Sequence, residues 1–430
     1  MKRAEQLPQY DDAELFTSCI AALSRKPPVV AQGEIDRLRT EIAEAAAGRR
    51  FILQGGDCAE RFKDCTAKVL KRKLQVLLQM SMVLTYATRK PVTRIGRLAG
   101  QYAKPRSANE ETVGTRKMPV YRGDLVNGYD AGDEARRPNP TRMLEGYYHA
   151  TASLNYIRAL IEGGFADLHH PEQWDLEFLE KSPEGDSYRR IADAITDAIH
   201  FMDTVGATDV AEKLRRIAFY TSHEALLLPY EEALTRMDDN ETAYNLGAHY
   251  LWLGYRTCTL DGAHVEYLRG IENPIGIKVG PGLDSHTLLA LLAVLDPRKT
   301  PGRITLITRF GANTVRKSLP SVINSVQKAG HPVLWCCDPM HGNTETASDG
   351  RKTRRTANIF SEIEQTFAIH GDSHSCLGGV HFELTGDVVT ECIGNNEEQD
   401  LCGRYDTACD PRLNAEQSLE MAFLIARLLR

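Results

Sequence analysis

The feature that most constrains the fold of this chain is the alternation of short apolar, β-branched runs with longer helical patterns. The runs typical of strands are Phe51–Gln54, Pro91–Ile95, Arg216–Thr221, Tyr250–Leu253, Ile275–Val279, Ile304–Thr308, Pro332–Cys337 and Gly379–Leu384. Helical patterns between and after them include Ala67–Thr88, His286–Leu295, Val315–Lys328, Ala357–His370 and Ala415–Leu429. Such alternation predicts parallel βα units, and eight of them close into a (β/α)8 TIM barrel. An open doubly wound sheet is the alternative, but no GxGxxG follows any predicted strand.

Two regions fall outside this alternation. Residues 1–48 are predicted to form an N-terminal helical extension, with helices at Asp12–Ser24 and Gly33–Ala47. Residues 49–430 are predicted to form the catalytic barrel, interrupted by a helical insertion at about 141–214. The pattern leaves open whether this insertion serves packing, an oligomer surface or regulation.

Composition excludes several classes of protein. The chain has 52 Lys and Arg against 58 Asp and Glu, which argues against a general nucleic-acid binder. The longest aliphatic run, Leu288–Leu295, is far shorter than the roughly 20 residues of a membrane span. The N-terminus lacks the apolar segment of a secretory signal, and the ten cysteines include no CxxC pair. We therefore expect a cytoplasmic protein in a reducing compartment, without membrane or nucleic-acid partners.

Charged, metal-binding or proton-carrying residue types stand at the end of each predicted strand. In chain order they are Cys58, Arg97, Glu224, Arg256, Lys278, Arg309, His341 and Glu383. The loops at the carboxyl-terminal ends of the strands build the active sites of such barrels. Each residue alone fits an ordinary solvated surface, but their recurrence at every strand indicates an active site.

The first group of these residues is cationic. With its neighbours it comprises Arg97, Lys104, Arg106, Arg256, Lys278 and Arg309, and the segment Ile95–Ser107 adds the hydroxyl donor Ser107. Converging guanidinium groups match the planar oxygens of phosphate and carboxylate, so this group predicts an anionic, phosphorylated substrate. The alternative is a solvated basic loop, which the net acidity of the chain disfavours.

The second group comprises Cys58, His341, Glu383 and Asp410, one soft ligand, one borderline ligand and two hard ones. Structural zinc sites prefer several Cys and His at tight spacing. Ligands delivered by separate strands instead indicate a catalytic divalent cation with a position open to substrate. Taken singly, His341 fits a hydrogen-bonded loop histidine better than a metal ligand, and Cys58 fits a buried thiol better. His169 and His170 lie in the insertion and are given no metal role.

Longer motifs connect these residues in order along nearly the whole chain. They are QGGDCAERF (Gln54–Phe62), GRLAGQYAKPRS (Gly96–Ser107), PVYRGDLVNG (Pro119–Gly128), TSHEALLL (Thr221–Leu228), LDGAHVEYLRGIENPIGIKVGP (Leu260–Pro281), LITRFGAN (Leu306–Asn313), DPMHGNT (Asp338–Thr344), GGVHFELTG (Gly378–Gly386) and YDTACDPRLN (Tyr405–Asn414). The chain thereby resembles the class II (plant-like) 3-deoxy-D-arabino-heptulosonate-7-phosphate (DAHP) synthases. The resemblance implies a metal-dependent (β/α)8 enzyme that condenses phosphoenolpyruvate with erythrose 4-phosphate. This reaction is the first step of the shikimate pathway or of a secondary-metabolite branch.

The resemblance also implies roles for individual residues. The metal ligands fall on Cys58, His341, Glu383 and Asp410, and the phosphoenolpyruvate contacts on Arg97, Lys104, Arg256, Lys278 and Arg309. Arg106 and Ser107 correspond to the aldose phosphate site. Glu224 corresponds to the carboxylate that is placed to act on the attacking water. Lys104, Glu224 and Lys278 are the expected catalytic residues. One divalent ion is expected, Mn2+ or Co2+, with Fe2+ and Zn2+ also suited to this ligand set. A homo-oligomer and an aromatic amino-acid effector are further expectations.

One segment departs from the family pattern. Tyr255 stands where the family usually has Glu, and Cys258 where it usually has a second Arg. Three interpretations follow: a tolerated variation, an amino-DAHP-type synthase that uses an imino aldose phosphate, or a non-catalytic metal-binding barrel with a regulatory role. Separately, Cys409 directly precedes Asp410, so metal-free protein is predicted to bring Cys409 close enough to Cys58 for a disulfide.

Overall fold

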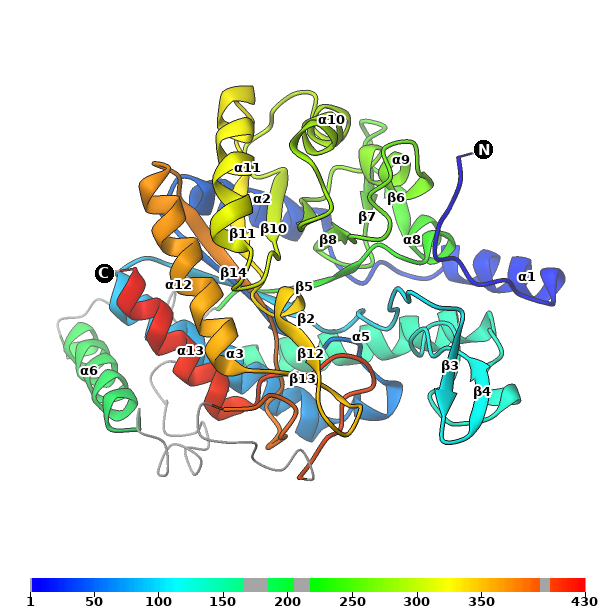
Figure 1. Ribbon diagram of the computed structural model, residues 1–430, viewed down its shortest axis with the longest axis horizontal. Coiled ribbons are helices and arrows are strands. Elements are labelled where there is room, and N and C mark those ends of the chain that lie inside the picture. The colour runs from blue at the N-terminus through cyan, green and yellow to red at the C-terminus, as the bar shows by residue number, and fades with distance from the viewer. Residues whose placement is uncertain (1, 166–184, 205–216, 395–402, 430) are drawn as a thin grey trace.

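A closed barrel of eight parallel strands forms the centre of the computed structural model, which describes residues 2–165, 185–204, 217–394 and 403–429 (Figure 1). The strands are β1 (Phe51–Gly56), β2 (Val92–Arg97), β5 (Phe219–Glu224), β8 (Tyr250–Leu253), β9 (Ile275–Val279), β10 (Ile304–Thr308), β11 (Leu334–Cys337) and β14 (Leu377–Glu383). The last strand closes the ring on the first, with Ile52 opposite Gly379. The predicted (β/α)8 barrel is confirmed.

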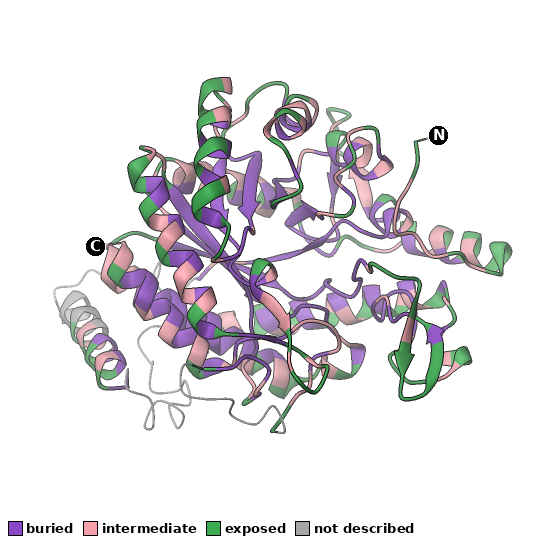
Figure 2. Cartoon of the chain, viewed as in Figure 1, coloured by how far each residue is buried: buried purple, intermediate pink, exposed green. Residues whose placement is uncertain are grey.

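Helices cover the outside of the barrel (Figure 1). They are α3 (Ala67–Thr88), α5 (Thr141–Glu162), α8 (Leu228–Ala233), α9 (Ala263–Arg269), α10 (Ser285–Leu295), α11 (Val315–Ala329), α12 (Thr356–Asp372) and α13 (Ala415–Leu428). The strands are buried, whereas the helices expose their outer faces (Figure 2). Among the described residues, no helix is both long and apolar enough to cross a membrane.

The N-terminal helices α1 (Ala13–Ser24) and α2 (Gln32–Ala46) have different surroundings. Leu38, Ile42 and Ala45 of α2 are fully buried. They form one cluster with inward-facing strand residues: Ile52, Ile95, Tyr220, Tyr250, Trp252, Ile307, Leu334 and Cys336. Helix α2 therefore seals the amino-terminal end of the barrel, and only the opposite end is left for a site. Helix α1 packs on α5 and α8.

The predicted insertion at 141–214 contains α5 and α6 (Gly185–Thr204). Helix α5 packs on α3, so it also supplies the helix that the ring needs between β2 and β5. Residues 166–184 and 205–216 lie outside the described part of the chain, and His169 and His170 are among them. The division into extension, barrel and insertion stays a prediction.

Several element boundaries differ from the predictions. Strand β2 continues past Ile95 to Arg97, and β5 past Thr221 to Glu224, because their polar ends are buried inside the barrel. Gln54 of β1 donates to Ser222 of β5 at 2.9 Å, which satisfies both side chains. Some short elements were not predicted. They include the helices α4 (Asp133–Arg136), α8 and α9, and the hairpins β3 (Glu110–Val113) with β4 (Arg116–Pro119), β6 (Thr235–Met237) with β7 (Ala243–Asn245), and β12 (Thr344–Thr346) with β13 (Lys352–Arg354).

Candidate active site

Strand alternation brings polar side chains to the carboxyl-terminal end of the barrel. Successive side chains of a strand point to opposite faces, so Arg97, Glu224 and Glu383 face inward two residues beyond Ile95, Ser222 and His381. All three are buried although charged. Charges buried together at the open end of a barrel are typical of an active site.

Two adjoining pockets open at this end. The first has a volume of about 180 Å³ and is lined by Arg97, Gln101, Lys104, Pro105, Glu224, Trp252, Gly254, Tyr255, Arg256, Lys278, Arg309, His341, Thr344, Lys352 and Asp410. The second, of about 210 Å³, shares Lys104, Arg256 and Asp410 with the first and adds Arg106 and Ser107. The side chains of Cys58 and Glu383 contact the ammonium group of Lys104. The structure therefore brings all the predicted site residues together.

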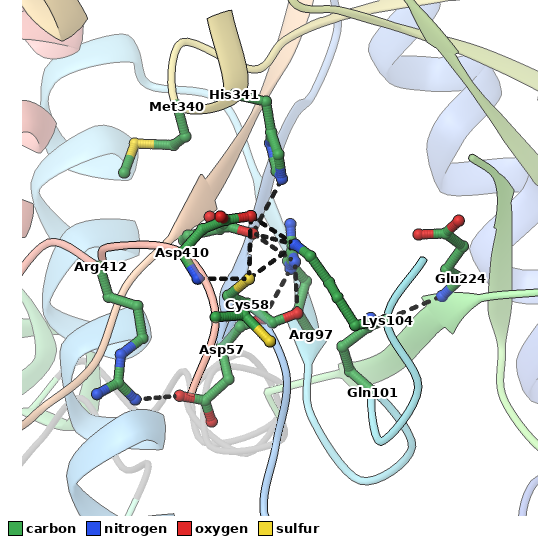
Figure 3. Close-up of polar contacts among 12 residues, drawn as sticks. Asp57, Cys58, Arg97, Gln101, Lys104, Glu224, Met340, His341, Asp410 and Arg412 are labelled. Carbon is green, nitrogen blue, oxygen red and sulfur yellow. Dashed lines mark hydrogen bonds and ion pairs between the residues drawn. The ribbon is translucent and has the colours of Figure 1, made fainter. Parts of the chain in front are cut away.

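Three of the four predicted metal ligands form a tight cluster. One ligand atom from each of Cys58, Glu383 and Asp410 lies within 4.8 Å of the others. The fourth, His341, places Nε2 3.0 Å from Glu383 Oε1. Figure 3 shows Cys58, His341 and Asp410 pointing toward one another from separate loops. A thiol, an imidazole and two carboxylates that converge in this way fit a single divalent cation.

The His341 ring is held with Nε2 toward this cluster. Its Nδ1 contacts Asp338 Oδ2 at 2.7 Å, and because a carboxylate accepts, the ring donates through Nδ1 while Nε2 faces Glu383. Burial lowers the pKa of His341 even though Asp338 and Glu383 oppose the shift. A neutral imidazole held by a carboxylate is the form in which histidine binds a metal.

The ammonium group of Lys104 lies among the same ligands. It is 2.7 Å from Cys58 Sγ, 2.9 Å from Asp410 Oδ2 and 3.6 Å from Glu383 Oε1 (Figure 3). Burial lowers the pKa of Lys104, but Asp410, Cys58 and Glu383 outweigh burial and hold that pKa well above its ordinary value. The cluster thus stabilises positive charge at its centre, which is what a metal site requires.

Further cations surround the two carboxylates. Glu383 forms ion pairs with Arg97 at 3.0 Å and Arg354 at 2.7 Å, and Asp410 forms one with Lys352 at 2.7 Å. Burial opposes ionisation of Glu383, but His341, Lys104 and the two arginines together hold its pKa well below the ordinary value. Lys352 and Arg354 were not among the predicted residues. The basic run that contains them, on β13, is the signal that could have identified them.

The part of the first pocket wall that Lys278, Arg309 and Arg256 form is cationic. Lys278 contacts Asp338 at 2.6 Å, and burial lowers its pKa to about 8, with Arg97 adding to the shift and Asp338 opposing it. Arg309 donates to the His341 carbonyl oxygen at 3.1 Å, while its buried Nε has no hydrogen-bond partner among the described residues. Arg256 donates to Ser107 Oγ at 2.7 Å and links the two pockets. This wall can bind an anion with several oxygens.

Glu224 stands apart from the metal ligands, across the site (Figure 3). Its backbone N–H donates to Gln101 Oε1 at 2.9 Å, and its carboxylate Oε1 is buried without a hydrogen-bond partner among the described residues. Burial raises the pKa of Glu224, although Lys104 and Lys278 oppose the shift. A Cβ at Gly254 would collide with this carboxylate, so Gly254 leaves the space in which the carboxylate lies. A carboxyl group with a raised pKa is suited to proton transfer.

Tyr255, the residue predicted to depart from the family pattern, forms part of the pocket wall. The Arg309 guanidinium carbon lies 5.3 Å from the centroid of its ring. A Cβ at Gly282 would collide with the phenol oxygen, so Gly282 leaves the space that this ring needs. The phenol ring of Tyr255 stabilises the Arg309 guanidinium through a cation–π contact and adds no negative charge beside the cationic wall.

The chain is similar in sequence to known proteins over nearly its whole length. Residues 1–426 match the family described as the class-II DAHP synthetase family. The chain is 46% identical to a phospho-2-dehydro-3-deoxyheptonate aldolase of Neurospora crassa, over 99% of this chain and 92% of that protein. It is also 46% identical to the protein of the same name in Streptomyces coelicolor, over 99% and 95% of the two chains. A solved phospho-2-dehydro-3-deoxyheptonate aldolase of Francisella tularensis covers 100% of this chain and 98% of its own, with 14% identity and a TM-score of 0.45.

Proposed function

Because the chain belongs to the class-II DAHP synthetase family, we propose that its two adjoining pockets form the active site of a DAHP synthase. The enzyme condenses phosphoenolpyruvate with D-erythrose 4-phosphate and water, giving DAHP and inorganic phosphate. This is the first step of the shikimate pathway, which leads to the aromatic amino acids. Both substrates are phosphorylated anions, as the cationic walls require.

One divalent metal ion is held by Cys58, His341, Glu383 and Asp410 in this proposal. The convergence of three ligand atoms within 4.8 Å, with Lys104 between them, supports the assignment. The mixture of sulfur, nitrogen and oxygen ligands favours Mn2+ or Co2+, and Fe2+ or Zn2+ would also fit. When bound, the ion supplies a Lewis acid for the aldehyde oxygen of the aldose phosphate.

Phosphoenolpyruvate binds against the cationic wall of the first pocket. Arg97, Lys104, Arg256, Lys278 and Arg309 all line it and carry the donors for its phosphate and carboxylate. The unpartnered Nε of Arg309 is one such donor. Five positive groups neutralise the substrate's charges, so that a second anion can approach its methylene carbon.

Erythrose 4-phosphate places its phosphate in the second pocket, beside Arg106 and Ser107. The contact between Arg256 and Ser107 at 2.7 Å supports this arrangement, because it places the two phosphate-binding groups side by side. The aldehyde end of this substrate then extends toward Asp410 and Lys104, which line both pockets.

Carbon–carbon bond formation is followed by addition of water. The methylene carbon of phosphoenolpyruvate attacks the aldehyde carbon, and water adds at the enol carbon. Glu224 accepts the proton of that water, a role that its free carboxylate oxygen and raised pKa support. Lys104 and Lys278 stabilise the negative charge that develops beside them, and collapse of the phosphohemiketal releases phosphate.

The observation that carries this proposal is the convergence of the metal-ligand cluster and the cationic wall on one pocket. The test is to supply Mn2+-loaded protein with both substrates and to follow loss of the enol and release of phosphate together. Both should occur only when both substrates and the metal are present. Glu224→Gln should retain phosphoenolpyruvate binding but lose turnover. Substrate binding by the wild type without turnover would contradict the proposal.

We further propose a homo-oligomer and an aromatic amino-acid effector, with the region of α5 and α6 as the surface for one or both. The support is that residues 98–218 separate β2 from β5, a longer connection than the barrel needs. Sedimentation of the metal-bound enzyme would test the first, and calorimetric titration with Trp, Phe and Tyr, singly and in pairs, the second. A monomer, or absence of both heat and inhibition, would contradict the corresponding part.

A further inference from the structure

Four buried charged side chains lie next to the metal-ligand cluster but are not among the proposed ligands. They are Lys73 of α3, Asp57 at the end of β1, and Arg412 and Glu391 of the segments after β14. Positive and negative groups alternate along this row, so its net charge is zero. We name it the Asp57–Arg412 network.

The contacts of the network are close and continuous. Lys73 forms an ion pair with one oxygen of Asp57, and Arg412 Nη1 contacts the other oxygen at 2.6 Å. Arg412 reaches Glu391 with two further nitrogens, Nη2 at 2.8 Å and Nε at 3.1 Å. Burial raises the pKa of Asp57, but Lys73 and Arg412 outweigh it and hold that pKa below its ordinary value. The carboxylate is therefore charged.

Two members of the network, Asp57 and Glu391, connect it to the segments that carry metal ligands. Asp57 immediately precedes Cys58, and its carboxylate points toward Arg412 while the Cys58 sulfur points toward Asp410 (Figure 3). Glu391 accepts hydrogen bonds from the backbone N–H groups of Asp406 at 3.2 Å and Arg412 at 2.8 Å. These two amides flank Asp410 in the sequence, so Glu391 fixes the segment that carries this ligand.

Stability alone is a weak reason for such a network. Replacing buried ion pairs by apolar side chains of similar volume is often neutral or stabilising, because desolvation cancels the attraction between the charges. Groups held by several directed contacts do, however, fix the relative positions of the segments that carry them. Here those segments are 352 residues apart and each supplies one ligand.

We propose that Lys73, Asp57, Arg412 and Glu391 are positioning residues that set metal affinity by fixing the Cys58 loop against the Asp410 segment. The inference rests on the proposed metal site. Partners of this kind, which orient ligands without touching the metal, typically change metal affinity 10- to 100-fold when removed.

The test compares two paired substitutions in the full chain. Asp57→Asn with Lys73→Met removes one charge of each sign and leaves Arg412 paired with Glu391. The matched control, Glu41→Gln with Arg50→Met, removes an ion pair of 3.7 Å at the opposite end of β1. Metal-free proteins are titrated with Co2+, followed by its visible absorption and its thiolate charge-transfer band, and with Mn2+ by calorimetry. Circular dichroism records cooperative unfolding of each variant.

The Asp57/Lys73 variant should bind Co2+ and Mn2+ about 10- to 100-fold more weakly, with a changed thiolate band, while the control binds like the wild type. Wild-type affinity and an unchanged band in the folded variant would overturn the inference. If that variant does not fold, Arg412→Lys decides by the same criteria, since lysine keeps the charge but cannot bind Asp57 and Glu391 simultaneously through a planar fork. Failure of the wild type to bind metal would instead refute the proposed metal site, and this inference with it.

Discussion

At the scale of single residues, Arg106 distinguishes the two phosphate sites, because it lines the second pocket and not the first. Arg106→Ala should weaken erythrose 4-phosphate binding by about 2 to 4 kcal/mol and phosphoenolpyruvate binding far less, since a bidentate charge-assisted contact is lost. Steady-state KM values for both substrates provide the measurement. Arg116→Ala, at an exposed position of β4, is the control. Equal weakening of both substrates would show that the two sites are wrongly assigned.

Lys278 introduces a pH dependence of phosphoenolpyruvate binding. Burial lowers the pKa of this ammonium group to about 8, so it loses its charge as the pH rises above that value. The affinity of the metal-loaded enzyme for phosphoenolpyruvate should fall above pH 8, by up to about tenfold per pH unit. Calorimetry without the second substrate measures this effect.

The control for this experiment is Lys278→Arg, because arginine stays protonated throughout the range. Its affinity should be lower overall but nearly constant from pH 7 to pH 9. An alkaline decline that persists in Lys278→Arg would assign the titration to another group.

At the scale of secondary-structure elements, α2 is a structural part of the barrel. Leu38 is fully buried where α2 seals the amino-terminal end. Leu38→Ala should lower the free energy of unfolding by about 2 to 5 kcal/mol, since it leaves a cavity that the strands cannot fill. Urea unfolding measures this, with Leu15→Ala at a position of 38% exposure on α1 as control. A loss no larger than that of the control would mean that α2 is dispensable.

The loops at the open end bring two thiols together. Burial raises the pKa of the Cys58 thiol, Cys409 lies close enough to add to that shift, and both are free cysteines. Metal-free protein exposed to air should form a disulfide between them, lose the ability to rebind metal, and regain it after reduction. Mass mapping with and without reductant detects the bond, and Cys409→Ser should stay reloadable. Two free thiols and full reloading in aged wild type would contradict this prediction.

An element can be predicted from the sequence when its signal, such as a cap or an apolar pattern, lies within the element itself. Helix α3 has the predicted bounds Ala67–Thr88, because Thr66 caps its start and a long apolar pattern runs through it. The hairpin β12–β13 was missed, since its two strands have three residues each and no apolar alternation. With it were missed Lys352 and Arg354, whose contacts with Asp410 and Glu383 arise only when the loops assemble. The eight barrel strands were predicted because their apolar runs are local signals, although β1, β2 and β5 continue past their predicted ends to Gly56, Arg97 and Glu224.

At the scale of the whole molecule, a bound metal would link the loop after the first barrel strand to the segment before the last helix. In the proposed site the ligands come from the loop after β1, from the turn after β11, from β14 and from the segment before α13. Binding to the folded protein alone should raise the free energy of unfolding by about 2.7 kcal/mol when the free metal is 100 times its Kd. Unfolding midpoints at increasing Mn2+ and after chelation measure this. Asp410→Asn should lose most of the increase and Asp349→Asn, in an exposed turn, none. A midpoint independent of metal would contradict the four-ligand site.

The closure of β14 on β1 also has a consequence for how the enzyme is made. During translation, Cys58 emerges early and Asp410 only after 352 further residues, so nascent chains go through most of their synthesis without a complete ligand set. At about 5 to 20 residues per second, that interval lasts roughly 20 to 70 seconds. Reactive thiols and unpaired strand edges remain open to other partners over this time. The growing polypeptide is therefore exposed to oxidation and aggregation before any catalysis is possible.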